Sequence, residues 1–284
     1  MELAAVEIVT SQGSFSADVA GPEGGPTVLL LHGFPQSRYT WRATVPLLAG
    51  AGYRAVAIDQ RGYSPGVRPA AVEAYATDRL VADVLDVLDA LGAETAHVVG
   101  HDWGGQVAWL TAAYHPGRVA TLTVLSRPHP AAFARSFALD EAQANRSRHH
   151  RRMTDSVADR WWADDRAALR AMLVDAGVPD ADASGYLEVF AERAGLEAAM
   201  NWYRAAAAGE GLAAASTPAV TVPTLYLWGD ADQTVGRVAA TLTAEHVTGP
   251  YRFVEIPAGG HFLTDDGSNA TVERELLAHL ATHG

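Results

Sequence analysis

The stretch that decides the fold reads Thr95-Ala96-His97-Val98-Val99-Gly100-His101-Asp102-Trp103-Gly104-Gly105. Its first five residues are largely short, apolar and β-branched, which is typical of a buried strand, and residues 106–115 have helical character. A strand that turns directly into a helix between glycines is a nucleophile elbow, which holds one side chain strained and exposed at the carboxyl end of the strand. That side chain is Asp102 here.

An aspartate at this position, where many elbows carry serine, decides the chemistry. Serine needs a base to remove its proton, whereas a carboxylate with a reference pKa of ~3.9 is already a nucleophile at neutral pH. Attack by a carboxylate on an ester or amide gives a reactive anhydride, but attack on an sp³ carbon with a strained or good leaving group gives a stable ester. Epoxides and alkyl halides meet that requirement, so Asp102 predicts one of these substrate classes.

The C-terminal third of the chain supplies an acid and a base in the expected order. Residues 224–228 read as a buried strand followed by Asp230 and Asp232, and residues 251–256 read as the next strand, followed by His261 on a Gly-rich loop. An acid that binds one imidazole nitrogen leaves the other free to activate water. We therefore predict His261 as the base with Asp232 or Asp230 as its acid, the other interpretation of Asp230 being a turn residue that binds backbone amides.

A second loop carries the remaining part of this arrangement. The apolar run 28–31 leads into His32-Gly33-Phe34-Pro35. The backbone N–H of Phe34, together with that of Trp103 directly after the nucleophile, is predicted to form an oxyanion hole.

These motifs carry a family resemblance. His32-Gly33-Phe34-Pro35, Asp59-Gln60-Arg61-Gly62-Tyr63-Ser64, Gly100-His101-Asp102-Trp103-Gly104-Gly105 and Gly260-His261-Phe262 resemble the α/β-hydrolase fold family, specifically its epoxide hydrolase branch. The resemblance spans most of the chain and is loose between about 131 and 216. It favours Asp232 over Asp230, and it implies that an epoxide is opened to a vicinal diol through an ester on Asp102, without metal or cofactor.

The loosely matching region supplies the expected donors to the epoxide oxygen. Asn201-Trp202-Tyr203-Arg204 resembles the cap-helix motif whose tyrosine binds that oxygen, which implies this role for Tyr203, the alternative being ordinary core packing. The stretch that in the family ends in a second cap tyrosine ends here in His149, which is either a weaker donor or part of a solvated basic helix face.

Aromatic residues complete the predicted site. We expect Trp103, Trp202 and Tyr186 to contact the substrate. Tyr186 is also the reserve donor for the epoxide oxygen, although with Val189 and Phe190 it has the spacing of one packed helix face.

Strand and helix patterns alternate along most of the chain. The expected strands lie near 6–10, 14–20, 27–31, 53–58, 96–99, 120–125, 223–228 and 251–256. This predicts an α/β protein with an eight-stranded, mostly parallel sheet, an antiparallel start and helices on both faces. The alternation stops after Pro130, so we expect residues 1–130 and 217–284 to form the core and residues 131–216 an inserted helical cap.

The composition of the chain indicates which classes of binding partner to expect. The chain has 284 residues, 49% hydrophobic, and 21 basic against 33 acidic side chains, a net charge of −12 that disfavours binding to nucleic acid or an anionic membrane. It has no cysteine, which excludes thiol catalysis and disulfides. Without a signal-peptide pattern, we expect a cytoplasmic enzyme that binds a small-molecule epoxide and water, with a homodimer left open.

Two other functions remain open at this stage. A haloalkane or haloacid dehalogenase uses the same aspartate, histidine and acid, but Phe34 lacks the side-chain amide that often binds halide, and Trp103 replaces the arginine that would resemble fluoroacetate dehalogenases. A member of the fold that binds a ligand or rearranges it without hydrolysis is the third interpretation.

Overall fold

The computed structural model describes residues 3–148, 153 and 155–283, in which eight strands form one sheet in the order β1-β2-β4-β3-β5-β6-β7-β8. The strands β1 and β2 pair antiparallel, as do β2 and β4, and all other neighbours are parallel. This confirms the predicted mostly parallel sheet with an antiparallel start. The bounds are Ala4–Thr10 (β1), Gly13–Ala20 (β2), Thr27–Leu31 (β3), Arg54–Ile58 (β4), Ala96–His101 (β5), Val119–Leu125 (β6), Thr224–Gly229 (β7) and Tyr251–Ile256 (β8).

The central strands are buried on both faces, which explains their unbroken apolar sequence. Every residue of β3 is buried. Leu29 and Leu31 belong to the core on one face of the sheet, and Val28 and Leu30 belong to the core on the other. An unbroken apolar run therefore marks a strand between two helical layers, since a strand with one solvated face would alternate.

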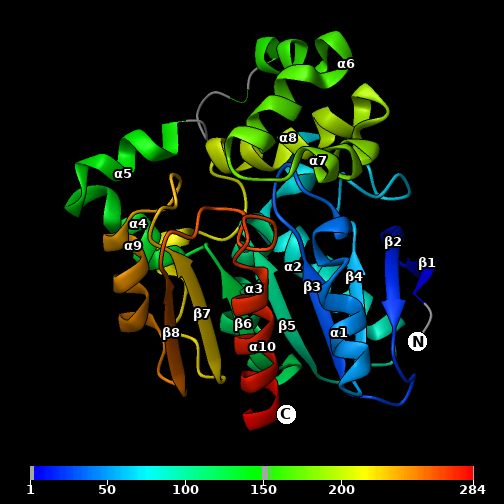
Figure 1. The fold of residues 1–284 in the computed structure, drawn as a ribbon, viewed down its shortest axis with the longest axis vertical. Helices are drawn as coiled ribbons and strands as arrows, with labels where there is room; N and C mark the ends of the chain where they lie inside the picture. Colours follow the sequence, from blue (N-terminus) through cyan, green and yellow to red (C-terminus); the bar gives the residue numbers. More distant parts are fainter. Residues whose placement is uncertain (1–2, 149–152, 154, 284) are drawn as a thin grey trace.

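Helices cover both faces of the sheet (Figure 1). Helices α1 (Thr44–Gly50) and α10 (Asn269–His283) pack on one face, while α2 (Thr77–Ala90) and α3 (Trp103–Tyr114) pack on the other. The short helix α9 (Arg237–Leu242) lies between β7 and β8 in the sequence. The sheet is thus the middle layer of a three-layer sandwich, and loops at its strand ends are free to build a site.

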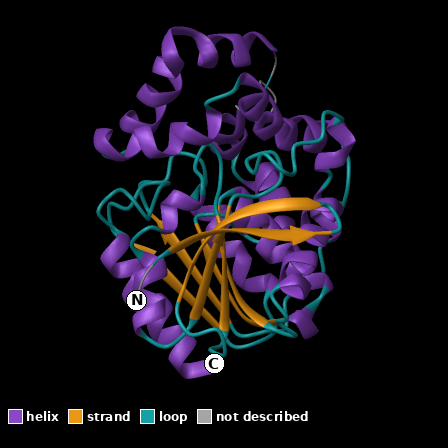
Figure 2. Cartoon of the chain, turned by 90° about the vertical axis from the view of Figure 1, so that its right-hand side faces the viewer, coloured by secondary structure: helices purple, strands orange, loops and turns teal. Residues whose placement is uncertain are grey.

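Between β6 and β7 the described chain is helical. Helices α6, α7 and α8 lie over the carboxyl ends of the parallel strands, apart from the layers that cover the sheet (Figures 1 and 2). Helix α6 is kinked at residues 163–166. The α-helices described between β6 and β7 are α4 (Pro130–Leu139), α5 (Glu141–Arg146), α6 (Asp155–Asp175), α7 (Asp180–Leu187) and α8 (Arg193–Ala208).

None of the described helices is both long enough and apolar enough to cross a bilayer.

The parallel part of the sheet gathers distant residues at one edge. Phe34 follows β3, Asp102 follows β5, Asp232 follows β7 and His261 follows β8. In an open α/β sheet ligands bind outside the carboxyl ends of the strands. Helices α6 and α8 lie over the same edge, so a cavity there is enclosed from both sides.

Candidate active site

The turn between β5 and α3 holds Asp102 in a strained conformation. Its backbone has φ 50° and ψ −117°, a region that L-residues other than glycine rarely occupy. Neighbouring glycines make the turn possible: a Cβ on Gly104 would lie 2.3 Å from the Leu31 carbonyl oxygen, and one on Gly33 would lie 2.4 Å from the Asp102 Cβ. The elbow therefore aims the Asp102 carboxylate outward at the sheet edge, as the sequence predicts.

The two oxygens of Asp102 have different partners. The backbone N–H of Phe34 donates to Oδ1 at 3.0 Å, and His261 Nε2 lies 3.6 Å from Oδ2. Burial raises the pKa of Asp102, but the hydrogen bond and charge of His261 outweigh it and hold the pKa well below its usual range. Asp102 is therefore a carboxylate at neutral pH, with Oδ1 fixed by an amide and Oδ2 beside the imidazole.

His261 is held from its other side by Asp232. Its Nδ1 lies 3.0 Å from Asp232 Oδ2, while the backbone amides of Thr234 and Val235 donate to Asp232 Oδ1 at 2.7 and 3.0 Å. Burial lowers the pKa of His261, but the charges and hydrogen bonds of Asp232 and Asp102 raise it to about 10. The resting site thus contains an imidazolium between two carboxylates.

The competing acid, Asp230, lies elsewhere. Its side chain is exposed, and its Oδ1 accepts a hydrogen bond from the backbone N–H of Ala258 at 2.7 Å. This is the contact of a turn residue, and it leaves Asp232 as the carboxylate in contact with His261.

A cavity of about 1070 Å³ opens above these residues. Asp102, His261 and Phe34 line it from the sheet edge, and Tyr203 lines it from α8. Helix α6 supplies a wall that no sequence motif marked. It is apolar at Trp161, Ala168, Ala171 and Met172 and charged at Arg160 and Asp175. The arrangement suits a substrate that is mostly apolar with one reactive polar group.

Tyr203 is buried among aromatic rings. The ring centroids of Phe34 and Trp103 lie 5.4 and 5.1 Å from that of Tyr203, both edge to face. Burial and the charge of Asp102 raise the pKa of Tyr203 well above its usual value, against a side-chain hydrogen bond from Trp103 that lowers it. Tyr203 therefore carries its proton at neutral pH and is a hydrogen-bond donor at the cavity wall.

Two of the predicted substrate contacts, Tyr186 and Trp202, are bonded away from the cavity. The hydroxyl of Tyr186 donates to Asp265, with oxygens 2.9 and 2.8 Å away, and the indole N–H of Trp202 donates to the Arg61 carbonyl oxygen at 2.9 Å. Neither residue is among the described residues that line the cavity, and the polar group of each is already bonded within the core. His149 lies outside the described residues.

A buried cation beside the site was also missed by the sequence analysis. Arg127, just after β6 at the same sheet edge, is buried and lies over the rings of Phe133 and Trp103, with its guanidinium carbon 4.4 and 5.6 Å from their centroids. Its Nε donates to Gln106 Oε1 at 3.0 Å. Its place after a buried strand was the available signal.

In the described part of the chain, no group of three or more His, Cys, Asp or Glu side chains is arranged so that it could hold a metal ion.

Comparisons with known proteins show the family to which the chain belongs. A family model described as the α/β hydrolase fold matches residues 26–268. Epoxide hydrolase A of Mycobacterium tuberculosis is 36% identical over 287 residues, covering 87% of this chain and 88% of that protein. Epoxide hydrolase 4 of Mus musculus is 33% identical, covering 92% of this chain and 75% of its own.

A solved structure gives the same result. The crystal structure of epoxide hydrolase A from Mycobacterium thermoresistibile superimposes with a TM-score of 0.81 at 29% identity, over 99% of this chain and 98% of that one. The chain therefore belongs to the α/β-hydrolase fold family and, within it, to the epoxide hydrolases, which are hydrolases that act on ether bonds.

Proposed function

We propose that this chain hydrolyses an epoxide to a vicinal diol through a covalent ester on Asp102. The observation that carries the proposal is the position of the Asp102 carboxylate in the cavity, with Oδ1 on the Phe34 amide and Oδ2 beside His261. Tyr203 lines the same cavity and retains its proton. The similarity to proteins named epoxide hydrolases supports this choice of substrate class.

In the first half-reaction Asp102 attacks an epoxide carbon. An oxygen of the carboxylate forms a bond to that carbon as the carbon–oxygen bond of the ring breaks, and Tyr203 donates its proton to the departing oxygen. The products are a hydroxyalkyl ester of Asp102 and a Tyr203 phenolate.

Ester formation then releases the base. The ester carries no charge, so His261 loses one of the two carboxylates that raise its pKa in the resting site. The imidazolium gives up its proton, which neutralises the Tyr203 phenolate. Neutral His261, still oriented by Asp232, is now able to accept a proton from water.

In the second half-reaction water attacks the carboxyl carbon of the ester. His261 accepts the proton of the attacking water, and the amides of Phe34 and Trp103 stabilise the oxyanion of the tetrahedral intermediate. When the intermediate collapses, the imidazolium protonates the departing diol oxygen. The Asp102 carboxylic acid then loses its proton to His261, which restores the resting ion pair.

We propose that residues 131–216 act as the cap over a core formed by residues 1–130 and 217–284. This segment contributes Tyr203 and the wall of α6 to the cavity. His149, as a second donor to the epoxide oxygen, remains a prediction from the sequence. The apolar lining favours aryl and alkyl epoxides over highly polar ones.

The test separates the two half-reactions. In His261→Gln the first step proceeds and the second fails, so intact-protein mass spectrometry after mixing with an aryl epoxide should show an adduct equal to the substrate mass. Asp102→Asn is the matched control and should show no adduct. A folded His261→Gln variant that neither turns over nor forms an adduct would contradict the proposal.

Turnover by the wild-type enzyme distinguishes the rival activity. A dehalogenase would release halide from alkyl halides and leave epoxides unchanged. Diol formation without halide release is the result expected here, because Tyr203 supplies a proton that a departing alkoxide needs and a halide does not.

A further inference from the structure

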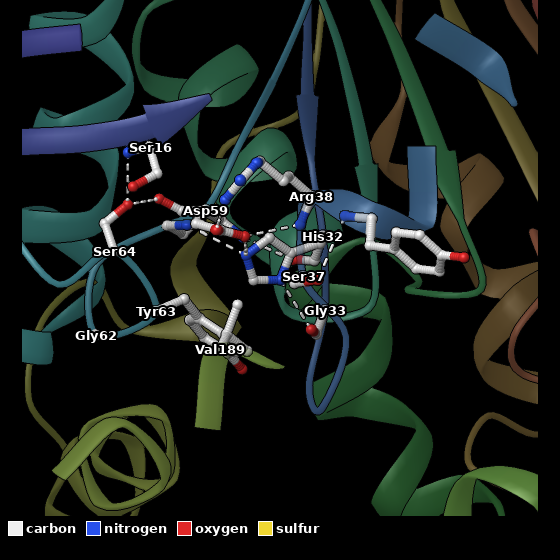
Figure 3. Close-up of polar contacts among 12 residues, drawn as sticks. Ser16, His32, Gly33, Ser37, Arg38, Asp59, Gly62, Tyr63, Ser64 and Val189 are labelled. Carbon is white, nitrogen blue, oxygen red and sulfur yellow. Dashed lines mark hydrogen bonds and ion pairs between the residues drawn. The ribbon is translucent and has the colours of Figure 1, made fainter. Parts of the chain in front are cut away.

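The loop after β3 is held by a buried network centred on His32 (Figure 3). His32 is completely buried, and its Nδ1 lies 2.9 Å from the carbonyl oxygen of Gly33. Its Nε2 accepts a hydrogen bond from the backbone N–H of Gln60 at 3.1 Å. Because a backbone N–H can only donate, Nε2 is the unprotonated nitrogen, and Nδ1 carries the proton that it donates to Gly33.

The acceptor of that bond shares a peptide unit with the proposed oxyanion-hole donor. The C=O of Gly33 and the N–H of Phe34 lie in one plane and point in opposite directions, because a peptide bond is planar. The Phe34 N–H donates to Asp102 Oδ1 at 3.0 Å. The Gly33 carbonyl oxygen also accepts a hydrogen bond from the backbone N–H of Gln36 at 3.0 Å. His32 and Gln36 together fix the carbonyl end of this peptide, and therefore also the direction of the Phe34 N–H.

We infer that His32 is a positioning residue of the active site, which orients the Gly33–Phe34 peptide so that the Phe34 amide faces the oxygen of Asp102. This inference rests on the proposed function, since it gives His32 its effect through the oxyanion of that reaction. His32 is not among the described residues that line the cavity, and its two ring nitrogens are both occupied by the backbone.

The surroundings keep the imidazole in one place. The ring of Tyr63 packs edge-on against it with centroids 4.4 Å apart, and the Gln60 side chain donates to the His32 carbonyl oxygen at 2.6 Å. The carboxylate of Asp59 lies 4.0 Å from Nε2 and is itself bound by Arg38, through its backbone N–H at 2.8 Å and its guanidinium (Figure 3). The imidazole thus has little freedom to rotate.

Burial also keeps this imidazole neutral. It lowers the pKa of His32 to about 4, aided by the charge of Arg38. The donor at Nδ1 and the acceptor at Nε2 therefore persist over the range of pH in which a carboxylate nucleophile and a histidine base work.

The two half-reactions depend differently on this peptide. In alkylation the Phe34 amide holds Oδ1 of a carboxylate that is already charged. In hydrolysis the same amide must stabilise a negative charge that develops only in the transition state, and loss of such a donor typically costs about 10²–10³-fold in rate. A misoriented peptide should therefore slow hydrolysis more than alkylation, and the ester on Asp102 should accumulate.

Two substitutions of similar polarity form a matched pair. In His32→Asn the side-chain N–H₂ stands near the position of Nδ1 and can still donate to Gly33. In His32→Gln the amide reaches the position of Nε2, keeps a contact with Gln60 and loses the bond to Gly33. If His32 only fills space, the two variants should be impaired alike.

The experiment is a single-turnover reaction with an aryl epoxide, with ester formation and ester loss followed by quenched intact-protein mass spectrometry. We expect His32→Gln to hydrolyse the ester about 10-fold to 100-fold more slowly than wild type, and His32→Asn to stay within about threefold. Equal hydrolysis rate constants in the two variants would overturn the inference, as would a defect confined to alkylation.

Two further measurements keep the outcome decisive. Hydrogen exchange at the Phe34 amide, followed by NMR without substrate, should be faster in His32→Gln than in His32→Asn. Equal exchange rates would contradict the proposed orienting role of His32 even if both variants are inactive.

His261→Gln in the single-turnover reaction with the aryl epoxide tests the proposed function. If it forms no ester, that function is wrong; if it forms ester while His32→Gln behaves as wild type, only the role of His32 is wrong.

Discussion

The pKa of His261 should depend strongly on the charge of Asp102, and Asp102→Asn tests this directly. Asparagine has the size of aspartate but no charge, so the variant mimics the electrostatics of the ester intermediate. His261 Nε2 lies 3.6 Å from Asp102 Oδ2. At that distance, with an effective dielectric constant of about 20, one unit charge pair contributes about 4.6 kcal/mol, equivalent to about three pKa units.

We therefore expect the pKa of His261 to fall from about 10 by about three units in Asp102→Asn. The assay is a pH titration of the ring nitrogens of His261 by NMR in both proteins, with ¹⁵N-labelled histidine. Asp232→Asn is a useful comparison, because it removes the other carboxylate, 3.0 Å from Nδ1.

A pKa that changes by less than half a unit in Asp102→Asn would refute this reasoning. It would mean that the ester intermediate retains an imidazolium, and that formation of the ester does not generate the base for the second step.

Four other outcomes follow from the same geometry. Tyr203→Phe should slow ester formation by about 10²-fold and leave ester hydrolysis nearly unchanged, as rapid-quench kinetics will measure, because only the first step needs the Tyr203 proton. Asp232→Asn should lower kcat by up to about 10⁴-fold, because His261 would take the wrong tautomer. Asp230→Asn should turn over at close to the wild-type rate, because the Asp230 side chain is exposed and accepts its hydrogen bond from the Ala258 backbone amide. Gly33→Ala should lose activity and unfold at a lower temperature in calorimetry, because the new Cβ would lie 2.4 Å from the Asp102 Cβ. The triad should contribute most to the unfolding free energy between about pH 4 and pH 6.5, as urea titrations at a series of pH values will measure. Because the pKa of His261 is raised, this contribution should decline as the pH rises towards about 10. Because the pKa values of Asp102 and Asp232 are lowered, it should also decline in acid.

The sequence was most informative where local pattern and chemistry coincide. All eight strands were predicted close to their observed bounds. The signal was clearest for the central strands β3, β5, β6 and β7, because buried parallel strands are unbroken apolar runs between turns. Asp102, Asp232 and His261 were placed at one edge because each lies in the loop after a parallel strand, and parallel strands share an end. The choice of Asp232 over Asp230 agrees with the observed contact to His261.

Residues on the helices over the site were harder to predict. Helical spacing shows which residues share a face, but not which packed face meets the cavity and which meets the core. Tyr186 and Trp202 were therefore assigned to the substrate, although their polar groups bond to Asp265 and Arg61. Trp161 of α6 was missed because its position depends on tertiary packing rather than on a motif. The buried Arg127 was missed although it follows a buried strand, because no recognised motif includes it.

The covalent ester on Asp102 is tested most directly by a single turnover in water enriched in heavy oxygen, with excess enzyme over epoxide. In the proposed mechanism water attacks the carboxyl carbon of the ester. One heavy oxygen should therefore remain in the peptide that contains Asp102, and the diol should be unlabelled. Label in the diol after the first turnover, with none in the protein, would show that water opens the epoxide directly and that Asp102 acts only as a base.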